Sequence, residues 1–86
     1  MLRLELTKRA LRFLERLPAK QFRQIMRRIL ALASDPAPPD SKLLKGAGLR
    51  VARSGEYRIV YEVIPEGVLR IIVVGKRNDA EVYRRL

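Results

Sequence analysis

The chain has 86 residues, the size of one small domain, and it contains no cysteine and no histidine, which excludes disulfides, thiol nucleophiles, imidazole catalysis and zinc sites built from those residues. A hydrophobic content of 48% is enough to bury a core, so we expect residues 1–86 to fold as a single domain. Nineteen Lys and Arg residues against nine Asp and Glu residues give a net charge of +10, and fourteen of the basic residues are arginine.

The first part of the chain predicts one strand followed by two helices. Residues 2–6 alternate leucine with charged residues, which is the period of a half-buried strand, and Thr7 can cap a helix after it. Apolar residues then recur at every third or fourth position over 8–17 and again over 19–33. Pro18 separates the two stretches and interrupts the helical hydrogen bonds. We therefore expect an antiparallel helical hairpin that carries its arginines outward.

The second part of the chain predicts sheet. Residues 34–41 hold three prolines and predict a loop. Strands are expected over 49–53, 56–64 and 68–75, separated by a Ser-Gly turn and a Pro-Glu-Gly turn. Two hairpins in series make an antiparallel meander.

The chain is expected to end in a short helix that Asn78 or Asp79 can cap. The predicted fold class is therefore α+β, with an N-terminal strand and a helical hairpin packed on a four-stranded, mainly antiparallel sheet. The helices would cover one face of this sheet and leave the other face for a ligand. No apolar run approaches the ~20 residues that span a bilayer, so we expect a cytoplasmic protein.

The arginine-rich composition favours a polyanionic partner, because the planar guanidinium group matches phosphate oxygens. RNA carries its own nucleophile, the 2′-hydroxyl group, so a protein can promote cleavage by orienting it and by neutralising charge on the phosphate. Arg50, Arg53 and Arg58 flank one predicted hairpin, and Lys76 and Arg77 follow the neighbouring strand. The acidic residues show no spacing typical of a metal site, so we expect no metal and no cofactor.

The tyrosines divide into two groups. Tyr57 and Tyr61 share the apolar side of their predicted strand and are expected in the core. Tyr83 lies outside the apolar pattern, and its hydroxyl group would exchange a proton more readily beside several guanidinium groups. Packing of the C-terminal helix is the alternative role for Tyr83.

Three stretches carry a resemblance to a known family. Lys45-Gly46, residues 53–62 (RSGEYRIVYE) and residues 74–83 (VGKRNDAEVY) resemble the RelE branch of the RelE/ParE superfamily of type II toxin-antitoxin toxins, and the likeness runs nearly end to end. The resemblance implies a RelE-like fold and an mRNA interferase that cuts message in the ribosomal A site without a metal. It also implies two partners, the ribosome with its mRNA and a cognate RelB-like antitoxin.

The resemblance assigns roles to particular residues. Arg58 and Arg77 match the family's phosphate-contacting, transition-state-stabilising arginines, and Tyr83 matches its C-terminal catalytic tyrosine. Two basic positions of the strand before the hairpin fall here on Leu49 and Val51.

Arg50 lies between those two apolar residues. Either a bulge lets Arg50 serve as a basic catalytic helper, or the proton-transfer group is missing and cleavage is slow or lost. Lys45, Arg53 and Lys76 are expected to assist by contacting the RNA.

Two other functions remain open from the sequence. A ParE-like protein would inhibit DNA gyrase and would not cut RNA, although it would not require the stretch from Lys76 to Tyr83. A catalytically inactive homologue would serve only as a partner for the antitoxin, which the loss of basic residues at Leu49 and Val51 allows.

Overall fold

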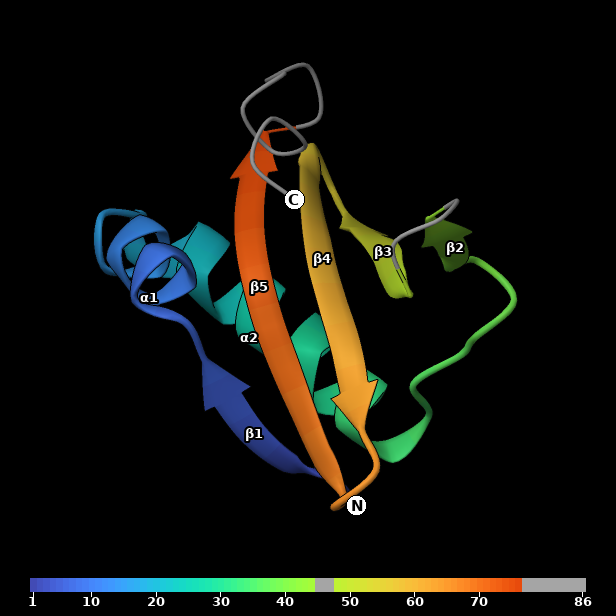
Figure 1. Ribbon diagram of the computed structural model, residues 1–86. Coiled ribbons are helices and arrows are strands. Elements are labelled where there is room, and N and C mark those ends of the chain that lie inside the picture. The colour runs from blue at the N-terminus through green and yellow to red at the C-terminus, as the bar shows by residue number, and fades with distance from the viewer. Residues whose placement is uncertain (45–47, 77–86) are drawn as a thin grey trace.

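A computed structural model describes residues 1–44 and 48–76 of the chain. Its elements are β1 (Arg3–Leu6), α1 (Lys8–Glu15), α2 (Ala19–Ser34), β2 (Lys42–Leu44), β3 (Leu49–Ser54), β4 (Tyr57–Ile64) and β5 (Val68–Lys76). The strands form one sheet in the order β1-β5-β4-β3-β2, in which β1 runs parallel to β5 and the other neighbours are antiparallel. In Figure 1, α2 passes behind β5 and β4. The predicted α+β class is confirmed.

The sheet has five strands and not the four that we predicted. The additional strand, β2, has three residues and pairs with β3 through Lys42 and Val51, Leu43 and Arg50, and Leu44 and Leu49. A segment of three residues is too short to show the alternation of apolar and polar residues that marks a strand. Its extended form depends on hydrogen bonds to β3. The predicted C-terminal helix, with Asn78 or Asp79 as its cap, lies outside the described residues.

The core lies between the helices and one face of the sheet. Leu14 of α1 and Ile29 of α2 are buried there together with Ile59 of β4 and Ile71 of β5. Tyr57 and Tyr61 belong to the same cluster, which confirms the prediction that both are core residues. Neither described helix has the length and apolar character to span a membrane.

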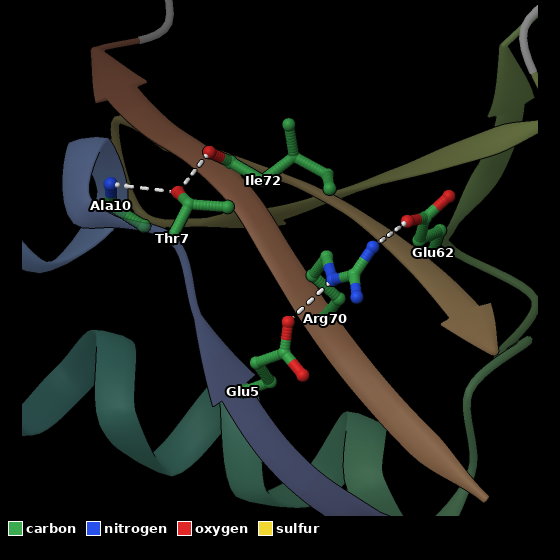
Figure 2. Close-up of polar contacts among 6 residues, drawn as sticks. All are labelled: Glu5, Thr7, Ala10, Glu62, Arg70 and Ile72. Carbon is green, nitrogen blue, oxygen red and sulfur yellow. Dashed lines mark hydrogen bonds and ion pairs between the residues drawn. The ribbon is translucent and has the colours of Figure 1, made fainter. Parts of the chain in front are cut away.

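Thr7 fixes the start of α1 to the sheet, as Figure 2 shows. Its Oγ1 accepts a hydrogen bond of 3.1 Å from the backbone N–H of Ala10, as the sequence predicts for an N-cap. The same hydroxyl group donates to the carbonyl oxygen of Ile72 at 2.6 Å. Ile72 lies at a bulge in β5, because Val60 pairs with Val73 whereas Tyr61 pairs with Ile71. One side chain therefore satisfies both a helix end and an irregular strand.

Replacing this hydroxyl group should weaken the fold. We expect Thr7→Val to lower the free energy of unfolding by about 1–2 kcal/mol, because it removes the cap and leaves the Ile72 carbonyl without its donor. Thr7→Ser keeps the hydroxyl group, so its free energy of unfolding should fall by clearly less. Urea denaturation followed by circular dichroism measures both; equal stability of Thr7→Val and wild type would contradict the assignment.

Tight turns bring β3 and β4 together. Gly55 between them has φ of +60° and Gly67 between β4 and β5 has φ of +86°, conformations that favour glycine. A Cβ atom at Gly55 would also lie 2.5 Å from Nε2 of Gln24. The turn at Gly55 sets the register in which Arg53 of β3 lies directly opposite Arg58 of β4.

Candidate functional site

Basic side chains gather on the face of the sheet opposite the helices. Directly paired residues of neighbouring strands point to the same face, and side chains alternate along each strand. Tyr57 and Ile59 point toward the helices, so Arg58 between them points to the other face, together with its partner Arg53. Lys42 of β2 is paired with Val51 of β3, which lies two residues before Arg53 and shares its face.

These residues surround a small pocket, which we call the basic pocket. It is lined by Asp40, Lys42, Val51, Arg53 and Arg58. Lys42 and Arg53 are exposed, so a ligand can reach them from solvent, and Arg58 is half-buried. Three cations and one carboxylate converge on it, and this charge suits an anionic group such as a phosphodiester.

Asp40 connects the basic pocket to α2. Its Oδ2 lies 2.8 Å from Nη2 of Arg28, and the side chain of Arg28 is only 20% exposed. The hydrogen bond from Arg28 is the main reason why the pKa of the Asp40 carboxyl lies below its usual range. The carboxylate is therefore ionised at neutral pH, and the ion pair is lost only in acid, as the pH falls through that lowered pKa. The prediction that Arg28 belongs to a solvated helix face is wrong, because Arg28 reaches the segment before β2.

A second arginine on the same face is neutralised, and Figure 2 shows its contacts. Nε of Arg70 lies 2.6 Å from Oε1 of Glu5, and its Nη1 lies 3.1 Å from Oε1 of Glu62. The three residues are paired across β1, β5 and β4. The bond to Glu5 is the main cause that raises the pKa of Arg70 above its already high value. Arg70 is thus neutralised by two carboxylates, whereas three cations and one carboxylate line the basic pocket.

The predicted site residues divide according to their place in the sheet. Arg53 and Arg58 lie together, as expected. Lys76 is paired with Tyr57, so its side chain belongs to the helix side of the sheet end, and the partner of Arg58 is Gly75. Lys45, Arg77 and Tyr83 lie outside the described residues.

Arg50 does not join Arg53 and Arg58. It is paired with Tyr61, so it points to the helix side, where its Nη2 donates a hydrogen bond of 2.9 Å to Oγ of Ser41. The bulge that was one alternative for Arg50 is absent from the described β3–β4 pairing, which runs without interruption from Arg50 to Ser54. Without a bulge, residues 50 and 53 necessarily point to opposite faces.

Lys42 is the pocket residue that the sequence analysis missed. It precedes two leucines, and no alternation marks β2 in the sequence. Its position opposite Val51 follows only from the pairing of β2 with β3. The Lys-Leu-Leu triplet after a proline-rich loop was the one available signal for an edge strand.

The fold and the pocket together define a class of protein: a small α+β domain with a helical hairpin on one face of its sheet and a pocket lined by basic side chains on the other. The family described as "ParE toxin of type II toxin-antitoxin system, parDE" matches residues 4–81. The chain belongs to this family and so to the RelE/ParE superfamily of toxins. No curated protein sequence matched the chain.

Solved structures agree with this assignment. The isolated RelE toxin of Escherichia coli superposes with a TM-score of 0.79 at 29% identity, over 96% of this chain and 92% of that one. The RelE–RelB complex of Pyrococcus horikoshii superposes with a TM-score of 0.78 at 29% identity, over 92% of this chain and 98% of that one. The toxin–antitoxin complex RelBE2 of Mycobacterium tuberculosis superposes with a TM-score of 0.77 at 26% identity, over 88% of this chain and 98% of that one. The chain is a RelE-like toxin of a type II toxin-antitoxin system.

Proposed function

We propose that the protein is a ribosome-dependent mRNA endonuclease that acts in the cytoplasm and inhibits translation. The observation that carries this proposal is the cross-strand pair of Arg53 and Arg58, with Lys42 beside it, on the face opposite the helices. Like charges directly opposite each other in a ladder destabilise a sheet. A phosphate group placed against both guanidinium groups relieves that repulsion, and the same contact counters the negative charge that grows during cleavage.

The reaction we propose is attack of the 2′-hydroxyl group on the adjacent phosphate, which yields a 2′,3′-cyclic phosphate and a 5′-hydroxyl end. Arg58 binds the phosphate from β4. Arg77 joins it in this role; Gly75, two residues earlier in the chain, lies directly opposite Arg58. Tyr83 orients the nucleophile. No step of this reaction calls on a metal or a cofactor.

Lys42 supplies the basic group that the resemblance leads one to seek at residues 49 and 51. Leu49 is buried in a small apolar cluster with Val60 and Val73, so it has a packing role. Val51 lines the basic pocket and is the direct partner of Lys42. A lysine stem is long enough to carry its ammonium group across the neighbouring strand. The charge therefore reaches the pocket from β2 instead of β3.

Phosphate contacts by these residues predict a defined salt dependence. For single-stranded RNA, the logarithm of the binding constant falls against the logarithm of salt concentration in proportion to the number of phosphates contacted. We expect Arg53→Ala to weaken binding of a short RNA and to reduce that slope by about 1. Fluorescence anisotropy over a range of salt concentrations measures it. An unchanged slope would place Arg53 away from the RNA, and Arg70→Ala is the control that should leave the slope unaltered.

The partner that restrains the toxin is proposed to be a RelB-like antitoxin. The relatives from P. horikoshii and M. tuberculosis were solved as toxin–antitoxin complexes. A net charge of +10 favours an acidic partner segment, and salt should weaken the complex to the extent that exposed charge pairs hold it.

Gyrase inhibition is the second candidate, because the matching family is described by its ParE members. One experiment separates the two functions. The purified protein is added to ribosomes programmed with a defined message and, in parallel, to a DNA gyrase supercoiling assay. Cut message with normal supercoiling supports the proposal; intact message with blocked supercoiling refutes it in favour of a gyrase inhibitor. Activity in neither assay indicates the inactive antitoxin-binding homologue.

A further inference from the structure

The basic pocket contains groups for proton transfer as well as for charge neutralisation. Attack by a 2′-hydroxyl group requires that its proton be removed and that the departing 5′-oxygen receive one. Arginine cannot supply either function, because its guanidinium group stays protonated in proteins. Among the residues that line the pocket, this leaves the carboxylate of Asp40 as an acceptor and the ammonium group of Lys42 as a donor.

The Asp40 carboxylate is held in a fixed orientation beside the basic pocket. Arg28, which is largely buried, holds one of its oxygens at 2.8 Å, so the group is oriented from α2. Asp40 and Lys42 are separated by one residue at the start of β2 and border the same pocket as Arg53 and Arg58. The two proton-transfer groups thus approach the pocket from the edge of the sheet, while the guanidinium groups approach from β3 and β4.

A purely structural role explains the Asp40 carboxylate less well than a role in the reaction does. The side chain of Asp40 is 67% exposed, so its pairing with Arg28 leaves most of the carboxylate open to solvent and to a ligand. A carboxylate next to three cations also weakens the attraction of the pocket for phosphate, which is a cost for a site that only binds RNA. The same carboxylate has a use if the site carries out chemistry.

Building on the proposed function, we propose that Asp40 and Lys42 are the catalytic base and acid of RNA cleavage. The Asp40 carboxylate accepts the proton of the 2′-hydroxyl group as the bond from that oxygen to phosphorus forms. The Lys42 ammonium group donates a proton to the 5′-oxygen as its bond to phosphorus breaks. Solvent then removes the proton from Asp40 and returns one to Lys42, so atoms and charges balance.

The test compares two variants on two messages. The first message is ordinary RNA; the second carries sulfur in place of the bridging 5′-oxygen at the cleaved position, and a thiolate departs without needing a proton. On ordinary message, we expect Asp40→Asn and Lys42→Ala each to cut about 10²–10⁴-fold more slowly than wild type. On the sulfur message, Lys42→Ala should approach the wild-type rate, whereas Asp40→Asn should stay slow. Asp40→Glu keeps a carboxylate and should retain part of the rate on ordinary message.

The outcomes separate this inference from the proposed function. If wild type cuts ordinary message and Asp40→Asn cuts it equally fast, the proposed base is wrong and the nuclease function stands. If the sulfur message changes the cleavage rates of Asp40→Asn and Lys42→Ala equally, the assignment of Asp40 as base and Lys42 as acid is wrong. If wild type leaves programmed message intact, the proposed function fails and this inference fails with it. Thermal melting of each variant shows that a slow rate does not come from unfolding.

Discussion

Replacing Arg58 with alanine should reduce message cleavage by about 10²–10³-fold, the usual effect of removing one preorganised group that stabilises transition-state charge. Arg58 is half-buried in β4, directly opposite Arg53 and Gly75, so its position is fixed by the sheet. Its contribution should appear in the rate of cutting on saturated ribosomes, because the charge it counters grows during the reaction. Single-turnover cleavage of a programmed message measures this.

Arg70→Ala is the matched control for Arg58→Ala. It removes the same charge from the same face, but Arg70 is already engaged by Glu5 and Glu62. It should cut message at nearly the wild-type rate. If Arg58→Ala and Arg70→Ala reduced the cleavage rate by a similar factor, net charge and not the pocket would govern cleavage.

Replacing Tyr61 with alanine should have the largest effect on stability, a loss of about 3–5 kcal/mol in the free energy of unfolding. Tyr61 is fully buried at the centre of the helix-side core. Its hydroxyl group also donates to the carbonyl oxygen of Pro36 at 2.6 Å, which fixes the proline-rich loop that leads to Asp40. Small domains have only about 5–15 kcal/mol in total, so this variant should lose a large share of its stability and melt at a clearly lower temperature than wild type.

Tyr61→Phe separates the two contributions of this side chain. It keeps the ring and removes only the hydroxyl group, so we expect a loss of about 1–2 kcal/mol. Urea denaturation of the two variants under the same conditions provides the comparison. If Tyr61→Phe were as stable as wild type, the bond to Pro36 would contribute nothing. If it were as unstable as Tyr61→Ala, ring packing would be the minor term.

The long elements could be predicted because their apolar periods are strong. The helical repeats of α1 and α2, the Thr7 cap and the glycine turns after β3 and β4 all agree with the structure. What the sequence could not supply were features created by pairing. β2 exists only beside β3, and the donation from Thr7 to Ile72 joins groups 65 residues apart.

The same reason explains the errors at the site. Arg53 and Arg58 could be placed on one face by simple alternation around Gly55. A bulge that brings Arg50 to that face was one of two alternatives, but the described sheet has its irregularity in the β4–β5 pair, next to Tyr61. Lys42 and the contact of Arg28 with Asp40 required knowledge of which segments meet at the sheet edge. Single residues could be assigned to faces, whereas groups that meet across strands could not.

The chemical identity of the RNA ends after incubation with programmed ribosomes tests the central claim most directly. If arginines of the basic pocket assist attack by the 2′-hydroxyl group, the upstream fragment ends in a 2′,3′-cyclic phosphate and the downstream fragment begins with a 5′-hydroxyl group. Ends that carry a 3′-hydroxyl and a 5′-phosphate group would show that water was the nucleophile and would contradict the account.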